Sequence, residues 1–352
     1  MSVHLWVRAE QRANEQRTPL MPDGAADLIA RGFTVTVEDS PTRCIPIDGY
    51  RDAGCTIAPA GSWTEAPEDA FILGLKELPD TPEALIHRHI FFGHAFKGQS
   101  AGQALLDRFR EGGGTLLDLE YLTDEDGRRV AAFGYWAGFA GAWVSLRTWA
   151  AQQRGETCGP VTVAHDKKKL LNDLQTELAA IGPRRPSAIV IGALGRVGRG
   201  ACDLLTAMGV TVTRWDMAET ASGGPFPEIL RHDLFVNSIL AGPSTPVFVE
   251  ADAATKPRRL TVIGDVACDP DSDFNPIKVY DRVTDWEKPA LRVAERPALD
   301  VMAIDNLPSL LPLESSEDFA AQLLPYLRTL TVADSGVWGR AEQTFKQHIA
   351  QD

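Results

Sequence analysis

The stretch Ser187-Ala-Ile-Val-Ile191 runs directly into Gly192-Ala-Leu-Gly195-Arg-Val-Gly198, and together they decide the fold of the second half of the chain. The apolar run favours a buried parallel strand. The glycines that follow permit a tight turn and close packing of the next helix on the strand. A helix is predicted over about residues 199–208, and a second strand over residues 210–216. Strand, glycine turn, helix and strand in this order predict a Rossmann-type α/β unit.

The glycine turn also predicts a ligand. Gly192, Gly195 and Gly198 stand where backbone N–H groups can face a pyrophosphate at a helix N-terminus. Their spacing is G-x-x-G-x-x-G rather than G-x-G-x-x-G, which alone is a weak signal. Asp216 ends the next strand, where a carboxylate accepts hydrogen bonds from a ribose 2′-OH and repels a 2′-phosphate. The combination predicts NAD rather than NADP as cofactor; a structural turn without a ligand is the alternative.

Three apolar runs in the first third of the chain each stop at ionisable residues. Short apolar runs of this kind are typical of buried parallel strands, and ligands bind outside the carboxyl ends of such strands. We therefore expect a lysine, a histidine and two glutamates to meet at one crevice. Each residue alone could equally be an ordinary surface or core side chain. The runs are 71–75, followed by Lys76 and Glu77; 90–93, followed by His94; and 115–119, followed by Glu120.

These residue types suit proton transfer. A histidine, with an ordinary pKa of about 6.5, can both give and take a proton at neutral pH. A lysine must have its pKa lowered by burial or by cationic neighbours before it can act as a base. Arginines lie near the same strand ends, in residues 8–17 and at Arg128 and Arg129. They suggest recognition of carboxylates, for which the guanidinium group is suited, or they are ordinary surface charge.

Composition limits the classes of function. The 352 residues suggest two domains, and the net charge of −13 argues against binding to nucleic acid or to an anionic membrane. No apolar run reaches the roughly 20 residues needed to span a bilayer, and the N-terminus lacks the pattern of a signal peptide. The five cysteines are scattered without a CxxC pair. We therefore expect a cytoplasmic protein without a metal site.

The remaining pattern predicts an α/β alternation over the first ~130 residues. A helix rich in glycine, alanine and tryptophan should follow and could connect two domains. Further strands and a helical tail should complete the second half. The expected strands are 3–7, 34–37, 234–237 and 260–265; the expected helices are 22–31, 99–111, 133–152, 167–181 and a tail from about Asp318.

At the ionisable strand ends, the arginines and the glycine turn, the chain resembles the NAD-dependent, L-lysine-forming saccharopine dehydrogenases of fungal lysine biosynthesis. Its wider fold is similar to that of alanine dehydrogenase. The resemblance extends over nearly the whole length. It implies an α/β fold of two Rossmann-like, doubly wound parallel-sheet domains with an active-site cleft between them. The substrate domain would be 1–135 plus 315–352, and the NAD-binding domain 136–314. The blocks that carry it include Arg8-Ala-Glu10, Gly74-Leu-Lys-Glu77, residues 127–134, residues 191–196 and residues 307–312.

The resemblance implies a reaction. Saccharopine is a secondary amine that joins lysine to a glutarate unit and carries three carboxylates. Oxidation of a C–N bond by NAD gives an imine, which water splits into L-lysine and 2-oxoglutarate. By this likeness Lys76 takes the amine proton, His94 is the acid–base group of imine hydrolysis, and Glu77 and Glu120 tune that pair.

The resemblance also implies a set of binding residues and a monomer. The chain departs from the family pattern at several positions. Leu240 replaces a tyrosine next to the cofactor, and Val197 and Ser238 stand where fungal members have a cysteine pair. The substrate-binding residues would be Arg12, Arg17, Gln99, Arg129, Phe133, Ala267, Cys268 and Asp269. The cofactor-binding residues would be Arg128, Gly192, Gly195, Arg196, Gly198, Asp216, Thr220, Leu240, Val266, Ile304, Asp305, Asn306 and Leu307.

Two other functions stay open. One is a related amino-acid or opine dehydrogenase with the same fold, for example one that acts on alanine. The other is an NAD-binding sensor that has lost catalysis. The presence of Lys76, His94, Arg17 and Arg129 together argues against the sensor. The number of arginines that face the cleft should distinguish a saccharopine dehydrogenase from an alanine dehydrogenase, because alanine has one carboxylate and saccharopine has three.

Overall fold

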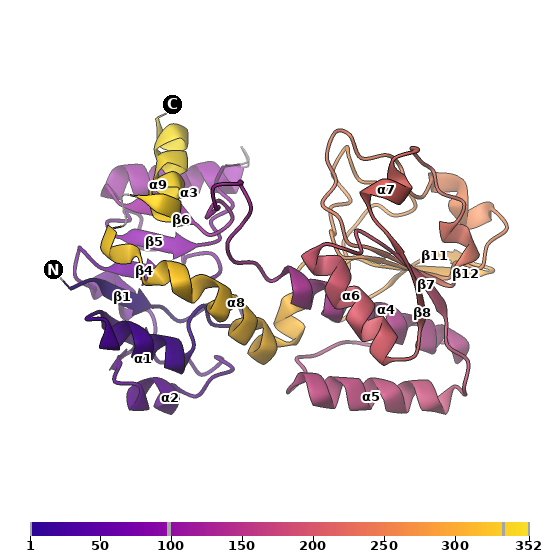
Figure 1. The fold of residues 1–352 in the computed structure, drawn as a ribbon, viewed down its shortest axis with the longest axis horizontal. Helices are drawn as coiled ribbons and strands as arrows, with labels where there is room; N and C mark the ends of the chain where they lie inside the picture. The colour runs from indigo at the N-terminus through magenta and orange to yellow at the C-terminus, as the bar shows by residue number, and fades with distance from the viewer. Residues whose placement is uncertain (1, 97–99, 333–334, 351–352) are drawn as a thin grey trace. The chain divides into compact units, whose positions relative to one another are not determined.

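The computed structural model describes residues 2–96, 100–332 and 335–350. The chain divides into two compact units, and each is described by itself (Figure 1). The first unit is Met1–Ala132 together with Pro312–Asp352, and the second is Phe133–Leu311. The chain therefore returns to the first unit after completing the second.

Among the described residues, the first unit contains one parallel sheet of six strands. The strand order runs in one direction from β1 to β3 and in the other from β4 to β6, so it reverses between β1 and β4. Ligands of open α/β sheets bind where the order reverses in this way. In spatial order the strands are β3 (Thr56–Ala58), β2 (Thr34–Glu38), β1 (His4–Val7), β4 (Phe71–Leu73), β5 (Arg88–Phe91) and β6 (Thr115–Asp118).

The helices of the first unit begin at residues that suit helix starts. Pro22 occupies the first position of α1 and Asp23 its first turn, and the helix stops before Gly32, whose φ is 90°. The helical tail begins at Pro312 rather than near Asp318, because proline is favoured at a first helical position. The first residues of the helix expected over 99–111 lie outside the described residues. The helices are α1 (Pro22–Ala30), α2 (Ile47–Asp52), α3 (Ser100–Gly112), α8 (Pro312–Leu327) and α9 (Gly336–Ile349).

A histidine lies in the core of this unit. His89 of β5 is fully buried, with ring centroids 5.2 Å from Trp63 and 5.5 Å from Phe109. Neither of its ring nitrogens has a hydrogen-bond partner among the described residues. Burial, with the nearby charge of Arg8, holds the pKa of His89 well below its ordinary value. The imidazole is therefore neutral in the folded state.

This histidine makes stability depend on pH. Below about pH 6.5 the unfolded chain binds a proton at His89 that the folded chain does not, so stability is lost as pH falls. The loss from this group is up to about 1.4 kcal/mol per pH unit. We expect His89→Phe to remove this contribution to the change in free energy of unfolding with pH, measured by urea unfolding at pH 7.5 and pH 5.5. Equal pH slopes for the parent and the variant would count against this account.

Among the described residues, the second unit also has a six-stranded sheet, parallel except for its edge strand β11. The strands predicted at 187–191, 210–216, 234–237 and 260–265 are present. The antiparallel pair of β11 and β12 was not predicted, because β11 is only partly buried and has a weak apolar pattern. In spatial order the strands are β11 (Leu291–Glu295), β12 (Ala298–Met302), β10 (Val262–Asp265), β9 (Leu234–Asn237), β7 (Ser187–Ile191) and β8 (Thr211–Trp215).

Both faces of this sheet are covered, which explains why its strands are continuously apolar. Ala188 and Val190 of β7 belong to a core with the helices, whereas Ile189 and Ile191 belong to a second core with Phe226 and the loops beyond. Figure 1 draws the three long helices of this unit, the lowest of which lies below the strands in this view. They are α4 (Gly134–Gln153), α5 (Lys167–Ala180) and α6 (Arg196–Ala207), and a short helix α7 (Met217–Thr220) follows β8.

Helix α4, the segment considered as a connector, is a core helix of the second unit that packs closely on α6. A Cβ added at Gly138 would lie 1.8 Å from the carbonyl oxygen of Val197, and one added at Gly200 would lie 1.9 Å from that of Tyr135. Both distances are far below a van der Waals contact. The small residues noted in the sequence are therefore required by helix–helix packing.

This packing predicts a large effect of one methyl group. We expect Gly138→Ala to lower the free energy of unfolding by at least about 2 kcal/mol, because overpacking forces the two backbones apart. Gly159→Ala is the matched control, since a Cβ there meets nothing within 4 Å. Chemical denaturation of both variants checks the expectation. A Gly138→Ala variant as stable as the control would refute the steric explanation.

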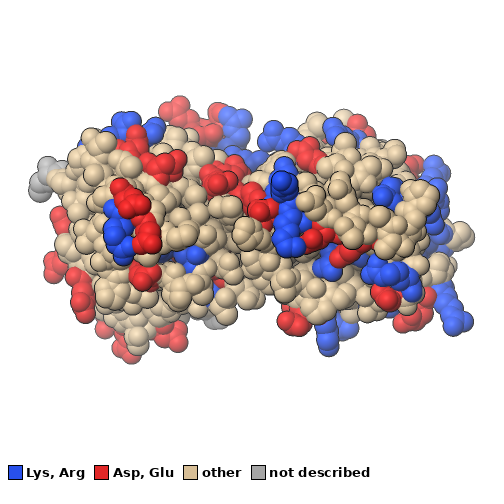
Figure 2. All heavy atoms as spheres, turned by 90° about the horizontal axis from the view of Figure 1, so that it is seen from below, with Lys and Arg blue, Asp and Glu red and all other residues tan. Residues whose placement is uncertain are grey.

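The surface agrees with the acidic composition. In the face drawn in Figure 2, Lys and Arg side chains are mixed with Asp and Glu side chains, and no single patch of positive charge covers that face. No helix in the described ranges is both long enough and apolar enough to cross a membrane.

Candidate active site

The proposed catalytic residues of the first unit follow neighbouring strands. Strand β4 pairs with β5, where Leu73 lies opposite Ile90, and β5 pairs with β6, where Phe91 lies opposite Asp118. Lys76, His94 and Glu120 come shortly after these three strands. The sequence prediction that the three runs are parallel strands ending at one edge of a sheet is therefore confirmed. The edge lies beside the point where the strand order reverses.

His94 and Glu120 contact each other. The imidazole Nδ1 lies 3.2 Å from Glu120 Oε2, and the His94 ring stacks on Phe92. The His94 side chain is 56% exposed, so its other ring nitrogen is accessible to a reactant, whereas Glu120 is 17% exposed. A carboxylate that fixes one ring nitrogen leaves the other free for acid–base work.

The backbone at His94 is unusual. Its φ is +49°, a left-handed conformation that non-glycine residues rarely adopt. Such a conformation costs on the order of 1 kcal/mol or more and persists only where the surroundings impose it. The strain singles out His94 among the residues at this sheet edge and supports a functional role.

Asp118 is the last residue of β6, two residues before Glu120, and is fully buried. Its Oδ1 accepts a hydrogen bond from the backbone N–H of Glu120 at 2.8 Å, and its Oδ2 has no hydrogen-bond partner among the described side and main chains. Burial raises the pKa of Asp118 to about 6, although the Glu120 N–H and the charge of His94 act in the opposite direction. A carboxyl group that titrates near neutrality thus lies beside the His94–Glu120 pair.

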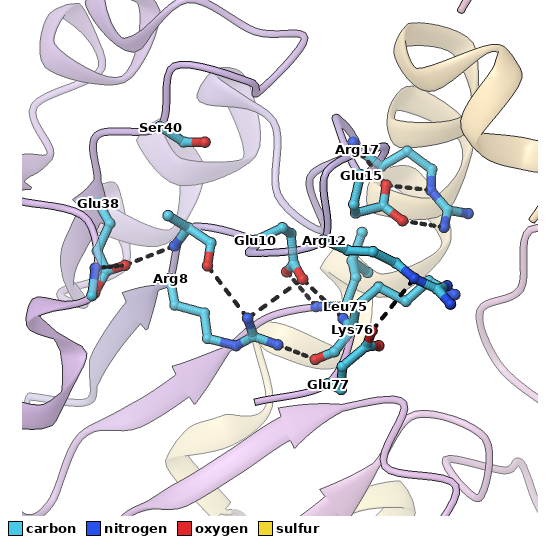
Figure 3. A network of polar contacts seen from close by, with 12 residues as sticks. Arg8, Glu10, Arg12, Glu15, Arg17, Glu38, Ser40, Leu75, Lys76 and Glu77 are labelled. Atoms are coloured by element: carbon cyan, nitrogen blue, oxygen red, sulfur yellow. Dashed lines mark hydrogen bonds and ion pairs between the residues drawn. The ribbon is translucent and has the colours of Figure 1, made fainter. Parts of the chain in front are cut away.

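Lys76 is half-buried after β4, and an ion pair lies beside it (Figure 3). Glu77 is exposed and its Oε1 lies 3.4 Å from Arg12 Nε. Glu15 is close enough for the positive charge of Lys76 to affect it. Burial raises the pKa of Glu15, but the hydrogen bonds and charge of Arg17, aided by Lys76, bring it below its ordinary value.

Arg17 makes a bidentate pair with a carboxylate of its own chain. Its Nε and Nη2 donate to the two oxygens of Glu15 at 2.8 and 2.6 Å, and both side chains are buried. Recognition of a substrate carboxylate by Arg17 stays a prediction. So does the role of Arg129, which is exposed and forms an isolated antiparallel bridge with Thr123.

Two other predicted residues, Arg128 and Phe133, are described away from this sheet edge, and a third is not described. Arg128 is 73% exposed and pairs with Asp124 and Asp126. Gln99 lies outside the described residues. Phe133 precedes the first turn of α4 and belongs to the second unit. The first unit therefore has Lys76, Glu77, His94 and Glu120 at one edge of its sheet. Their catalytic roles and the substrate-binding residues stay predictions.

The glycine turn of the second unit has the geometry that a dinucleotide requires. Gly192 has a φ of +82°, and a Cβ at Gly198 would lie 2.1 Å from the carbonyl oxygen of Gly192. Gly195 is exposed, and a Cβ there would meet only that same oxygen, at 3.4 Å. Helix α6 begins at Arg196, three residues before its predicted start, and no side chain caps its N-terminus. The N-terminus of a helix favours an anion, because its first N–H groups point along the helix axis.

Asp216 follows β8 and faces the same turn. Its Oδ2 accepts from the backbone N–H of Leu194 at 2.9 Å, and its Oδ1 accepts from that of Met217 at 2.9 Å. Each carboxylate oxygen can accept a second hydrogen bond, so a ribose hydroxyl can still bind there. Thr220 donates from its hydroxyl to the Asp216 carbonyl at 3.0 Å and so belongs to the same short helix start.

The surroundings of the turn fit an adenosine. Leu194, Met217 and Leu240 expose 74%, 82% and 78% of their surface, which is unusual for large apolar side chains. The hydroxyl oxygen of Ser238 is buried without a partner in the described part of the chain, and its backbone lies 3.1 Å from a Cβ built on Gly192. The glycine cradle, the apolar rim and this polar atom fit NAD.

The remaining predicted residues of this unit follow the next strands of the sheet: Val266 and residues 304–307 for the cofactor, and Ala267, Cys268 and Asp269 for the substrate. Val266 to Asp269 come after β10, where Asp265 Oδ1 accepts from the backbone N–H groups of Ala267 and Cys268 at 3.2 and 3.4 Å. Cys268 has a φ of +53° and its thiol contacts the Ala303 carbonyl, and burial raises the pKa of this thiol to about 12. The turn after β12 contains Ile304, Asp305, Asn306 and Leu307, of which only Asp305 is exposed.

The sequence patterns did not single out three buried ionisable side chains of the first unit, Glu10, Glu15 and Asp118. They also did not predict that Arg8, one of the arginines considered for carboxylate recognition, is buried. A signal existed for Asp118, a charge inside an apolar run, and for Arg8, the first residue after β1. No group of histidine, cysteine, aspartate and glutamate suited to a metal ion occurs in the described ranges.

Comparison with known proteins shows the family to which the chain belongs. A family model described as alanine dehydrogenase/PNT, N-terminal domain, matches residues 6–140. The solved structure of an L-alanine dehydrogenase has a TM-score of 0.70 at 17% identity and covers 98% of this chain and 94% of its own. At that identity the likeness shows the fold alone.

Similarity to curated proteins is much higher. Saccharopine dehydrogenase (NAD(+), L-lysine-forming) of Candida glabrata is 43% identical over 365 residues, which cover 100% of this chain and 98% of the relative. The protein of the same name from Yarrowia lipolytica is 43% identical over 360 residues, covering 99% and 98%. The chain therefore belongs to the family of NAD(+)-dependent, L-lysine-forming saccharopine dehydrogenases, which confirms the family predicted from the sequence.

Proposed function

We propose that the chain oxidises saccharopine with NAD and releases L-lysine and 2-oxoglutarate, in a reversible reaction. The proposal rests on 43% sequence identity with proteins named for that activity, over 98% of their length. Family membership bears out the predicted class, an NAD-dependent oxidoreductase acting on a CH–NH bond. When bound, NAD supplies the acceptor for a hydride from the carbon beside the secondary amine.

The first unit contributes the proton transfers. Lys76 takes the proton of the secondary amine, since it lies half-buried at the sheet edge beside Arg12 and Glu15. His94 exchanges protons with water and with the amine nitrogen during imine hydrolysis. Glu120 accepts from one ring nitrogen and keeps the other directed outward. Asp118 supports this pair, and Glu77 with Arg12 sets the charge around Lys76.

Substrate binding depends on the basic residues of the first unit. Saccharopine carries three carboxylates, and the guanidinium group binds a carboxylate through two parallel hydrogen bonds. Arg12, Arg17 and Arg129 are the proposed partners, together with Gln99. Because Arg17 already pairs with Glu15, a substrate carboxylate at Arg17 must share that guanidinium through its remaining donors.

NAD is held by the second unit in this proposal. Gly192, Gly195 and Gly198 let the backbone approach the pyrophosphate, and Arg196 adds a positive charge at the start of α6. Asp216 accepts from the adenosine ribose. The other proposed contacts from this unit are Thr220, Leu240, Val266 and residues 304–307 for the cofactor and residues 267–269 for the substrate. Arg128 is a proposed cofactor contact from the first unit.

The proposal predicts a discrimination between two cofactors. Asp216→Ala should lower the ratio of kcat/KM for NAD to that for NADP by at least about tenfold, since the carboxylate repels the 2′-phosphate. Asp166→Ala is a matched control, because Asp166 also caps a helix, through the N–H of Lys169. Steady-state kinetics with both cofactors measure the ratio. An unchanged ratio in Asp216→Ala would remove Asp216 from the cofactor site.

Turnover tests the whole proposal. NADH oxidation should be observed with lysine plus 2-oxoglutarate, and it should be much slower with pyruvate plus ammonia. Activity only with the second pair would favour an alanine dehydrogenase. NAD binding without any turnover would favour a sensor.

Location and assembly are proposals as well. We place the protein in the cytoplasm, which agrees with five cysteines that all carry free thiols. We also propose a monomer, and light scattering of the purified chain measures its mass. A dimer mass would contradict the monomer.

A further inference from the structure

We propose that Arg8 and Glu10 are positioning residues that fix the main chain on both sides of the Lys76 Cα. This role rests on the proposed function, because it matters for catalysis only if Lys76 is the base. Neither residue is among those that the family resemblance assigns to substrate or cofactor, and the burial of Arg8 argues against the carboxylate recognition considered for the arginines of residues 8–17. Both come from the segment that follows β1, the strand next to β4 in the sheet.

Glu10 holds the amide side of Lys76. Its Oε1 accepts from the backbone N–H of Leu75 at 2.7 Å, and its Oε2 accepts from that of Lys76 at 3.0 Å (Figure 3). Strand β4 ends at Leu73, so the N–H groups of Leu75 and Lys76 lie beyond the end of the strand. The carboxylate supplies their acceptors instead.

Arg8 holds the carbonyl side. Its Nη2 donates to the backbone oxygen of Lys76, and its Nη1 lies 3.4 Å from Glu10 Oε2 (Figure 3). The two side chains therefore form one unit that grips the N–H and the C=O of the same residue. We call this unit, Arg8 with Glu10, the Lys76 clamp.

The clamp is buried and fitted. The side chains of Arg8 and Glu10 are 1% and 5% exposed. A Cβ at Gly74 would lie 2.3 Å from Arg8 Nε, so only glycine leaves room for the guanidinium. Burying an ion pair gives little net stability, because desolvation offsets the attraction. Its value here is that it places the lysine backbone.

Placement matters for a base at the end of a flexible side chain. A general base must come within hydrogen-bond reach of the proton it removes. A displacement of about 1 Å can cost on the order of 10²-fold in rate. By fixing the Cα of Lys76, the clamp leaves only the side-chain torsions free to move the amine.

The first unit offers a matched control for the clamp. Glu38 is another fully buried carboxylate, and it accepts from the backbone N–H groups of Ala9, Gly61 and Trp63 at 2.8, 2.9 and 2.6 Å. It thus has the same kind of structural role, but its hydrogen-bond partners among the described residues are Trp6, Ala9, Gly61 and Trp63. Glu10→Gln and Glu38→Gln make the same substitution at two buried carboxyls that accept from backbone N–H groups.

Amide hydrogen exchange tests the contact without any substrate. In Glu10→Gln, exchange at Leu75 and Lys76 should speed up by at least about tenfold, because hydrogen bonds to a charged acceptor are weakened. Exchange at Gly61 and Trp63 should stay unchanged. Glu38→Gln should give the reverse. Unchanged exchange at Lys76 in Glu10→Gln, or equal acceleration at all four amides in both variants, would overturn the clamp.

A double-mutant cycle then tests its role in catalysis. Glu10→Gln should lower kcat by roughly 10- to 100-fold with the KM for NAD unchanged. The same change in a Lys76→Met background should cause no further loss, since the clamp acts only through Lys76. Losses that multiply in the double variant would show a general structural role and overturn the proposal.

The two failures can be told apart. If the wild-type chain does not turn over saccharopine, the proposed function fails, while hydrogen exchange still decides whether the clamp exists. If Glu10→Gln does not fold, Arg8→Lys takes its place, because one ammonium cannot contact both Glu10 and the Lys76 carbonyl as the guanidinium does. Arg8→Lys should then lower kcat as well, and a normal kcat would overturn the proposal.

Discussion

Lys76→Met should lower the turnover of saccharopine by at least about tenfold, and by up to the ~10²–10⁴-fold that acid–base groups typically contribute. Methionine keeps the length and much of the apolar contact of lysine but cannot accept a proton. The KM for NAD should not change, because no proposed NAD contact involves this residue. Steady-state kinetics at saturating NAD measure the effect.

The pH profile identifies what Lys76 does. A base must be deprotonated to act, so wild-type kcat/KM for saccharopine should fall as the pH drops below the pKa of that base. In Lys76→Met the slope of log kcat/KM against pH, on the acidic side of the profile, should decrease by one. Lys168→Met is the control, since Lys168 is an exposed lysine on α5. Near-normal turnover in Lys76→Met would disprove the proposed base.

His94→Gln should also lower steady-state turnover by at least about tenfold. Glutamine can still hydrogen-bond to Glu120, but it cannot carry a proton between water and the imine. Oxidation of the first equivalent should persist while hydrolysis slows. We therefore expect a burst of one NADH per active site followed by a slow phase, measured by stopped-flow absorbance.

The control for this variant is a similar pair elsewhere in the chain. His165 Nδ1 lies 2.9 Å from Asp166 Oδ2, and its side chain is 82% exposed. His165→Gln should leave the rate unchanged. A His94→Gln variant with a slow first turnover and no burst would place His94 in the oxidation step instead of in hydrolysis.

Much of the fold could be predicted from local patterns. The three apolar runs became β4, β5 and β6, and the glycine turn became the join between β7 and α6. These succeeded because continuous apolar runs and glycine turns each have one dominant structural solution. Boundaries were harder. Helix α6 starts early at Arg196, and α8 starts at Pro312, because terminal residues are decided by packing and by proline.

The site was predicted less completely, for a physical reason. Strand ends locate Lys76, His94 and Glu120, since parallel strands bring sequence positions to a common edge. Partners that lie deeper, such as Asp118 and Glu10, depend on side-chain burial and on which strands are neighbours. Arg17 shows the same limit: its pairing with Glu15, two residues away, is a matter of loop conformation. Sequence periodicity contains no information of that kind.

The central claim is the oxidation of one particular bond of saccharopine. Saccharopine has two C–N bonds at its secondary amine, and only oxidation on the glutarate side gives lysine and 2-oxoglutarate. The direct measurement is quantitative mass spectrometry of the products after incubation of the purified chain with saccharopine and NAD. We predict L-lysine, 2-oxoglutarate and NADH in equal amounts. Glutamate as the product, or no NADH at all, would contradict the account.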